Sequence, residues 1–513
     1  MKSNYLSELQ SRRRFIRHAA CAAVGTIGMT NVLRDLRFMS SALAQSNITD
    51  YKALICVFLN GGNDSNNMII PTIPSEWQSY AAARSSVLAI PNTDGGPATA
   101  LALNSRNGQA GYPANDNHTY GLHPAMPELR SLFNAGHAAA LFNVGTLSYP
   151  ITKAQYNSGA VPKPPQLYSH SDQQTQWQTS IPDQPAVSGW GGRLSDLMTT
   201  PVNVNAGGQI SMALTLAGSN IFEVGNVNAA PQYSVSTGGA VTISGVSGAR
   251  QTTMQSILSD DINLNQDLQT KAYANVLNHA INESSIVSTS LTKNASASFL
   301  SRFPATVVTP NGGVSFNSSL MNQMKMVARL IDIGSRPYNG VDGYGLGMKR
   351  QIFFIQVGGY DTHTVQTASA TSSNPSNSTV IIGAQAQLLA ELSQTLNAFY
   401  LAMGDLGLAN NVTAFTMSDF GRTFPSNGSG SDHGWGSHHF IVGGAVKGGA
   451  TYGKLPTLTV NGPDDTGTGR WIPTTSVDQY AATLASWFGV DPDNLSTIFP
   501  NLGRFTSSNL GFI

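Results

Sequence analysis

Short apolar runs recur along the chain and predict buried β-strands. The clearest run begins at Ile352 and ends at Val357, is rich in β-branched and aromatic residues, and is too short for a typical helix. Runs that are apolar at successive positions are typical of strands covered on both faces, as in a parallel sheet. Similar runs occupy residues 53–59, 139–144, 411–417 and 440–446.

Longer segments between these runs carry apolar residues at helical spacing. A helix is predicted within residues 122–141, before the run at 139–144, and this order of strand, helix and strand is the unit of a parallel α/β sheet. Further helices are predicted at residues 253–284, 319–334 and 384–403.

Residues 201–247 have a different pattern, in which Val, Ile and Thr alternate among Gly, Ser and Asn. This alternation predicts a β-rich insertion at about 200–250, acting as a cap or a substrate-facing subdomain. The segment contains no recognisable catalytic motif.

The charge balance excludes one class of partner. Lys plus Arg and Asp plus Glu each number 28, charged residues make up 11% of the chain, and no basic block occurs. Proteins that bind nucleic acid usually carry a basic patch or stripe. We therefore expect no nucleic-acid partner.

The N-terminus has the features of a twin-arginine signal peptide. Paired arginines within residues 11–17 precede a modestly apolar stretch at 19–29, and Ala42-Leu43-Ala44 offers a small-residue cleavage site. We therefore divide the chain into a signal peptide, residues 1–44, and one mature domain, residues 45–513. The predicted destination is the periplasm or the exterior, with the twin-arginine translocase as the export partner. No other stretch has the ~18 apolar residues that a membrane span needs.

Three of the predicted strands end in residues suited to binding a metal. Asp361 and His363 follow the central run, Asp64 follows the run at 53–59, and Asp419 follows the run at 411–417. Open α/β sheets bind ligands at the carboxyl ends of their strands, and mixed carboxylate and imidazole ligands suit Zn²⁺ or a similar ion. Each motif alone also fits an Asp that caps a turn.

Two further stretches carry candidate site residues. His433 precedes the run at 440–446 and lies near an acidic strand end, which favours a ligand role, whereas His438 and His439 fit a ligand or a solvated loop equally well. Ser169 precedes a predicted helix. It could be the helix N-cap, or a hydroxyl whose ionised form and incoming anion are favoured at the helix N-terminus, and both roles can hold together.

These motifs together resemble the exported family known as domain of unknown function 1501. The resemblance covers nearly the whole mature chain and rests on the signal peptide and six short motifs. The motifs are Gly61-Gly62-Asn63-Asp64, Ser169-His170, Gly359-Tyr360-Asp361-Thr362-His363, Ser418-Asp419-Phe420-Gly421-Arg422-Thr423, Asp432-His433 and Gly443-Gly444-Ala445-Val446-Lys447-Gly448-Gly449.

That family is similar in turn to the alkaline phosphatase and sulfatase superfamily. The similarity implies a three-layer α/β sandwich with a mainly parallel central sheet. It also implies a nucleophile at Ser169, and one or two divalent ions, of the Zn²⁺ type, on a set of acidic and imidazole ligands. The implied ligands are Asp64, Asp361, His363, Asp419 and His433. Two departures from the superfamily pattern are that Asp361 and His363 are two residues apart rather than four, and that Phe420, not His, follows Asp419.

We therefore expect an exported metal-dependent hydrolase whose substrate is a small phosphate or sulfate ester. Arg422 is the candidate for clamping the anionic oxygens of the ester. The alternative is a periplasmic or cell-surface protein without catalytic activity that retains a structural metal site or binds a partner through its insertion.

Overall fold

The structure is a computed structural model that describes most of the chain beyond the predicted signal peptide. It describes residues 48–92, 99–202, 210–227, 231–241, 245–264, 267–310, 313–338, 343–367 and 381–513. The predicted signal peptide at 1–44 lies outside these ranges. Within them, no helix combines the length and the apolarity that crossing a bilayer requires.

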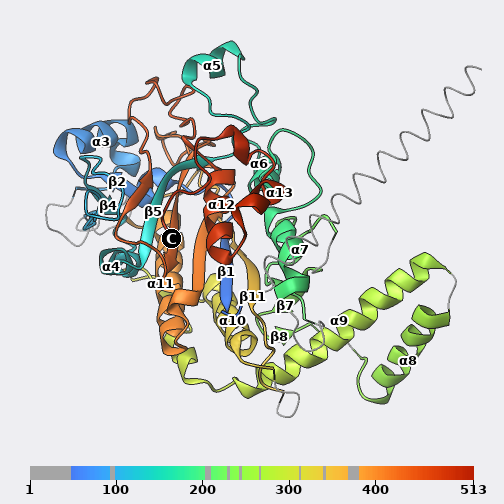
Figure 1. The fold of residues 1–513 in the computed structure, drawn as a ribbon. Coiled ribbons are helices and arrows are strands. Elements are labelled where there is room, and N and C mark those ends of the chain that lie inside the picture. Colours follow the sequence, from blue (N-terminus) through green and yellow to red (C-terminus); the bar gives the residue numbers. More distant parts are fainter. Residues whose placement is uncertain are drawn as a thin grey trace, which may run out of the picture.

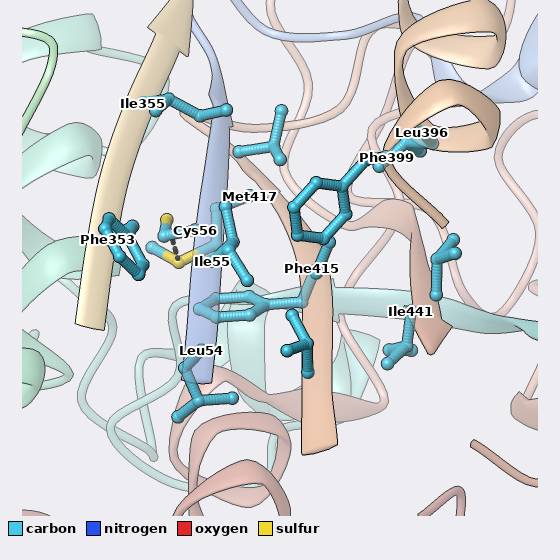
Figure 2. Close-up of a cluster of buried hydrophobic side chains, with 14 of the residues drawn as sticks. Leu54, Ile55, Cys56, Phe353, Ile355, Leu396, Phe399, Phe415, Met417 and Ile441 are labelled. Atoms are coloured by element: carbon cyan, nitrogen blue, oxygen red, sulfur yellow. Dashed lines mark hydrogen bonds between the residues drawn. The ribbon is translucent and has the colours of Figure 1, made fainter. Parts of the chain in front are cut away.

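Three parallel strands form the centre of the fold: β1 (Lys52–Leu59), β11 (Arg350–Val357) and β12 (Val412–Ser418). Residues 53–59 of β1 have no exposed surface, because the strand is covered on both sides by neighbouring strands and on both faces by helices. Figure 2 shows side chains of these strands packed together, with Cys56 against Met417 and Phe399 approaching from a helix. Burial of each large apolar side chain contributes roughly 1.5–3 kcal/mol.

The central sheet is mainly parallel, as the sequence predicts. Its strand order is β14-β5-β13-β12-β1-β11-β6-β7-β8, with β15 also paired to β5. Among its described strands, only β13 and β8 run antiparallel to the rest. The other members are β5 (Ala138–Gly145), β6 (Ala213–Thr215), β7 (Tyr233–Ser236), β8 (Gly239–Ala240), β13 (Ser437–Gly443), β14 (Thr451–Gly453) and β15 (Thr475–Ser476).

Helices cover both faces of this sheet (Figure 1). On one face α10 packs on β11, α11 on β13 and α4 on β5, and on the other face α12 packs on β1 and α7 on β11 and β6. This arrangement confirms the predicted three-layer α/β architecture. The helices are α4 (Pro127–Ala135), α6 (His170–Thr179), α7 (Trp190–Val202), α10 (Ser319–Ser335), α11 (Ala384–Asp405), α12 (Val477–Phe488) and α13 (Leu495–Ile498).

The segment predicted as an insertion, at about 200–250, contributes strands to the central sheet. Strands β6 and β7 extend the sheet beyond β11 in parallel, and β7 and β8 form a hairpin. After them, α8 (Ala249–Leu264) and α9 (Leu268–Lys293) form a helical hairpin that projects from the body of the protein (Figure 1). The pattern at 253–284 therefore belongs to two helices rather than one, and the Asp267 side chain caps the second.

The remaining described elements are short segments around the sheet. They are α2 (Ser65–Met68), β2 (Ile69–Pro71), α3 (Pro74–Leu88), β3 (Leu101–Ala102), β4 (Tyr120–Leu122), α5 (Lys153–Ser158), β9 (Val307–Val308) and β10 (Ser315–Phe316), with 3₁₀ turns at Ser298–Arg302, Ala409–Asn411, Pro492–Asn494 and Leu502–Arg504.

The register of the sheet brings the predicted site residues to one edge. Leu59 lies opposite both Val357 and Ser418, so β1, β11 and β12 end at the same level. The start of β13 and the end of β5 reach that level too, since Ser437 pairs with Val144. We call this the carboxyl edge of the sheet.

Candidate metal centre

The turn after β11 places Asp361 and His363 at the carboxyl edge. The Tyr360 N–H donates to the Asn60 carbonyl oxygen over 3.1 Å, which ties this turn to the end of β1. Gly61 makes the close approach possible, because a Cβ there would lie 2.3 Å from the Asp361 backbone nitrogen. The first glycine of the pair before Asp64 therefore allows the position of Asp361.

Four side chains converge at this edge, and we call them the histidine cluster: His170, Asp361, His363 and His433. Asp361 Oδ1 lies 3.2 Å from His363 Nε2 and 3.3 Å from His433 Nε2. The two Nε2 atoms of His363 and His433 are 2.9 Å apart, and Asp361 Oδ2 lies 3.6 Å from His170 Nε2. The ligand atoms that His170, Asp361 and His433 offer all lie within 4.8 Å of one another.

Each imidazole of the cluster is oriented by a hydrogen bond at its other nitrogen. The Nδ1 atom of His170 donates to Asp419 over 2.6 Å, that of His363 to Asp432 over 2.8 Å, and that of His433 to the Tyr168 carbonyl oxygen over 2.8 Å. These partners are acceptors, so the proton of each neutral ring sits on Nδ1. The three Nε2 lone pairs therefore point toward Asp361, and those of His363 and His433 also face each other.

This arrangement fits a divalent cation. Tetrahedral Zn²⁺ with bonds of about 2.0–2.1 Å holds its ligand atoms about 3.3–3.4 Å apart. The separations of 2.9, 3.2, 3.3 and 3.6 Å bracket that value. His170 Nε2 is also buried and has no hydrogen-bond partner among the described residues, and an imidazole that donates its second nitrogen to a carboxylate or carbonyl is the usual form of a metal ligand.

Asp419 lies behind the cluster. Its carboxylate is completely buried and accepts hydrogen bonds from the Gly61 N–H, from His170 Nδ1 and from Gln174 Nε2, at 3.1, 2.6 and 2.8 Å. The hydrogen bond from His170 raises the pKa of that imidazole, against the opposing effect of burial. The structure thus places Asp419 where it orients His170.

The aromatic residue after Asp419 packs against two of the imidazoles. The Phe420 ring centroid lies 4.8 Å from that of His170 and 4.7 Å from that of His433. Position 420 carries no imidazole, and α6 instead brings His170 to the Asp419 carboxylate from a distant part of the chain. Burial lowers the pKa of His433, and the nearby charges of His170 and Arg422 act in the same direction.

Arg422 is buried beneath the cluster. Its side chain is 0% exposed, whereas that of Asp361 is 46% exposed, and Nη1 donates to Asp361 Oδ1 over 2.6 Å. Other guanidinium hydrogens go to the carbonyl oxygens of Gly61 and Ser431. Burial alone would raise the pKa of Asp361, but the hydrogen bond and charge of Arg422 lower it. In this structure Arg422 faces Asp361 and not the solvent from which an ester would arrive.

Asp64 is turned toward a different set of partners. Its carboxylate pairs with the buried Arg84 of α3 and accepts a hydrogen bond from Gln366. Arg84 also donates to the carbonyl oxygens of Thr423 and Phe424. Asp64 therefore belongs to a buried ion pair beside the site, and it makes no hydrogen bond to the histidine cluster.

Ser169 lies at the border of the cluster as the N-cap residue of α6. Its hydroxyl does not cap the helix and donates instead to the Asp172 carboxylate over 2.6 Å. Its neighbours on both sides contact the cluster, Tyr168 through its carbonyl oxygen and His170 as a member. The hydroxyl is thus held by a base in the first turn of the helix.

His438 and His439 lie inside β13 and away from the cluster. Both are buried, and burial lowers the pKa of each to about 3. His438 Nδ1 accepts from the Asn143 N–H, and the His439 ring packs against Trp177. The strand that was predicted at 440–446 begins at Ser437, so these histidines occupy core positions and not loop positions.

Sequence reasoning did not assign two residues of the site, His170 and Asp432. The signal for His170 was its position directly after Ser169 at the start of a predicted helix, and the signal for Asp432 was its position directly before His433. The hydrogen bonds that identify them join segments 249 and 69 residues apart in the chain.

Comparison with known families confirms the resemblance over the C-terminal part of the chain. Residues 346–504 match the family described as "Protein of unknown function (DUF1501)". This segment includes Asp361, His363, Asp419, Arg422 and His433, whereas Asp64 and Ser169 lie outside it. No curated protein matches the sequence.

The backbone has a distant likeness to that of solved structures, one of which is Ps i-CgsB in complex with k-i-k-neocarrahexaose. The TM-score is 0.32, and the sequences are 10% identical over 90% of this chain and 78% of that chain. Another is the PsFucS1 sulfatase from Pseudoalteromonas sp., with a TM-score of 0.32 and 9% identity over 89% of this chain and 72% of that chain. These values describe a distant likeness and do not bear on the function of this chain.

Proposed function

We propose that this chain, whose residues 346–504 match DUF1501, is an exported metal-dependent hydrolase of phosphate or sulfate esters. The observation that carries the proposal is the convergence of three imidazole Nε2 atoms on Asp361 while each Nδ1 donates away from the cluster. Unprotonated nitrogens repel one another in this arrangement unless a cation lies between them.

The histidine cluster would hold one Zn²⁺-type ion, with His170, Asp361, His363 and His433 as ligands. A bound ion would supply Lewis-acid stabilisation of the anionic ester oxygens and would lower the pKa of a hydroxyl or water beside it. Asp64 and Asp419 are engaged with Arg84 and His170 respectively, so we assign them to supporting roles and favour a single ion.

The surrounding residues would prepare the site for an anionic substrate. Arg422 keeps Asp361 ionised, and Asp419 fixes the ring of His170. Ser169 would be the nucleophile, because its hydroxyl donates to the Asp172 carboxylate, a base that can accept the proton. The N-terminus of α6 carries a partial positive charge that favours an incoming anion.

Export would follow the twin-arginine route, on the motif at residues 11–17. That route carries folded proteins, which suits a protein that acquires its metal before it crosses the membrane.

Purified protein loaded with Zn²⁺ tests the proposal with an aryl phosphate and an aryl sulfate. Ser169→Ala should lower kcat by about 100-fold or more and leave the metal content unchanged. The melting temperature should change little, since the Ser169 hydroxyl makes no cap hydrogen bond. A tightly bound ion without turnover of either ester would favour the alternative, a non-catalytic exported protein with a structural metal site.

A further inference from the structure

A second arginine lies beside the histidine cluster, on the segment between β14 and β15. Arg470 Nε donates to the carbonyl oxygen of His433 over 2.9 Å. Its guanidinium carbon lies 4.4 Å from the centre of the Tyr168 ring, and the Tyr168 carbonyl oxygen is the acceptor for His433 Nδ1. Arg470 therefore contacts His433 and also Tyr168, the residue that accepts the hydrogen bond from the His433 ring.

The loop that carries Arg470 is organised by one buried carboxylate. Asp465 is completely buried and accepts backbone N–H groups over 2.7 to 2.9 Å. The donors are Asn461, Gly467, Gly469 and Arg470. Such a network holds the backbone of Arg470 in place before any ligand arrives, which lowers the entropy cost of binding.

The terminal nitrogens of Arg470 are available to a ligand. Nη1 and Nη2 make no hydrogen bond to any described residue, and the side chain is partly exposed. Arg504 is a useful contrast, because it also stacks at 4.4 Å, over Tyr149, but its Nη1 is bound to Asp183 and to the Ser148 carbonyl oxygen. A fixed guanidinium with free donors matches the geometry of a carboxylate, sulfate or phosphate.

Two tyrosines and a lysine follow Arg470 along the surface of the protein. The Tyr168 hydroxyl lies 3.1 Å from that of Tyr156, and Lys163 Nζ lies 4.3 Å from the centre of the Tyr156 ring. These residues form a tract from Arg470 to the exposed Lys163, with a cation at each end and hydroxyls between them. The tract suits a substrate that extends beyond its reacting ester.

We propose that Arg470 binds a second anionic group of the substrate, outside the ester that reacts at the histidine cluster. This inference rests on the proposed function and adds a substrate class, namely esters whose leaving group is itself negatively charged. The position of Arg470 supports a separate site for the second anionic group. Arg470 contacts the main-chain oxygen of His433, whereas the reacting ester would lie on the Nε2 side of the His433 ring.

Binding of two phosphonates to the Zn²⁺-loaded protein, measured by calorimetry, tests the inference without turnover. Benzylphosphonate carries one anionic group, and 4-carboxybenzylphosphonate carries a second. The wild-type protein should bind the carboxylated compound about tenfold more tightly, as expected for a charge-assisted hydrogen bond. Arg470→Gln, which keeps a donor for His433, should reduce the ratio of the two Kd values to about one. Arg470→Lys should retain part of the preference.

Arg504→Gln is the matched control, since it removes a stacked arginine elsewhere, and it should keep the wild-type ratio. Equal affinities for the two phosphonates in the wild-type protein would overturn the inference and leave the proposed function standing. A preference that survives Arg470→Gln would overturn the assignment to Arg470. A protein that binds Zn²⁺ but neither phosphonate would overturn both proposals.

Discussion

The carboxyl edge of the sheet and the projecting α8–α9 hairpin are built in opposite ways. At the carboxyl edge, charged side chains are buried and hydrogen-bonded to specific partners, as Arg422 and Asp419 show. The hairpin instead leaves large apolar side chains in solvent. The exposed fractions are 58% for Ile257, 71% for Leu264, 80% for Leu268, 69% for Tyr273 and 68% for Val276.

The difference indicates where function resides. A buried charge is costly unless it is paired and hydrogen-bonded, so the dense network at the carboxyl edge implies that each side chain there has a defined position. The hairpin makes few contacts outside its own two helices, apart from those of α9 with β8 and α10. We therefore expect metal binding to depend on the carboxyl edge and to be insensitive to the hairpin.

The largest effect should come from removing a cluster imidazole. His170→Ala, His363→Ala and His433→Ala should each weaken Zn²⁺ binding by more than about 100-fold, since changes to outer-shell partners already cost about 10–100-fold. Competition with a chelator of known affinity measures this loss. His279→Ala, in the hairpin, is the control and should retain wild-type affinity. Equal loss in all four variants would show that the effect is not specific to the site.

A smaller effect should follow from changing the carboxylate behind His170. Asp419→Asn preserves the size of a completely buried side chain but weakens the acceptor for His170 Nδ1. Zn²⁺ affinity should fall by about 10–100-fold without complete loss. If Asp419→Asn abolishes binding as fully as His170→Ala, Asp419 is a ligand itself, as the sequence alone had predicted.

The core histidines should affect stability and not metal binding. Burial lowers the pKa of His439 to about 3, against about 6.5 when unfolded. Between these values the unfolded chain binds a proton at His439 that the folded chain does not. The contribution of His439 to the free energy of unfolding therefore falls as the pH falls from 6.5. The expected contribution is about 1.4 kcal/mol per pH unit.

Urea unfolding with chelator at pH 7 and pH 5 measures this slope for the wild-type protein and for His439→Phe. The difference between them isolates His439, because Glu223 and Asp478, whose pKa values burial raises to about 7, act with the opposite sign in both proteins. On going from pH 7 to pH 5, the free energy of unfolding of His439→Phe should therefore rise relative to that of the wild-type protein. Identical slopes would mean that His439 has the same pKa in the folded and the unfolded protein.

The smallest effect is expected in the hairpin. Leu264→Ser and Leu268→Ser alter side chains that are mostly exposed, so the free energy of unfolding should change by no more than about 0.5 kcal/mol. Zn²⁺ affinity should be unchanged. A loss of affinity in either variant would contradict the separation of the two regions.

Much of the sheet was predictable because its strands are buried on both faces. Apolar runs located β1, β11 and β12 within a few residues, and their aligned ends brought Asp361 and His363 to one edge. The direction of β13 was not predictable, since an apolar run carries no information about its partner. The buried ion pair of Asp64 was not predicted, because its partner Arg84 lies in a helix and arginines are mostly exposed. His170 was not assigned to the site, because only the packing of α6 brings it there.

We propose that the histidine cluster binds one divalent ion. X-ray absorption at the Zn K-edge, combined with the metal-to-protein ratio, tests it directly on the purified protein. We expect one ion per chain with three imidazole nitrogens and one carboxylate oxygen at about 2.0–2.1 Å, and one fewer imidazole or no ion in His170→Ala. A wild-type protein that binds no ion, or an ion whose ligands are unchanged in His170→Ala, would contradict it.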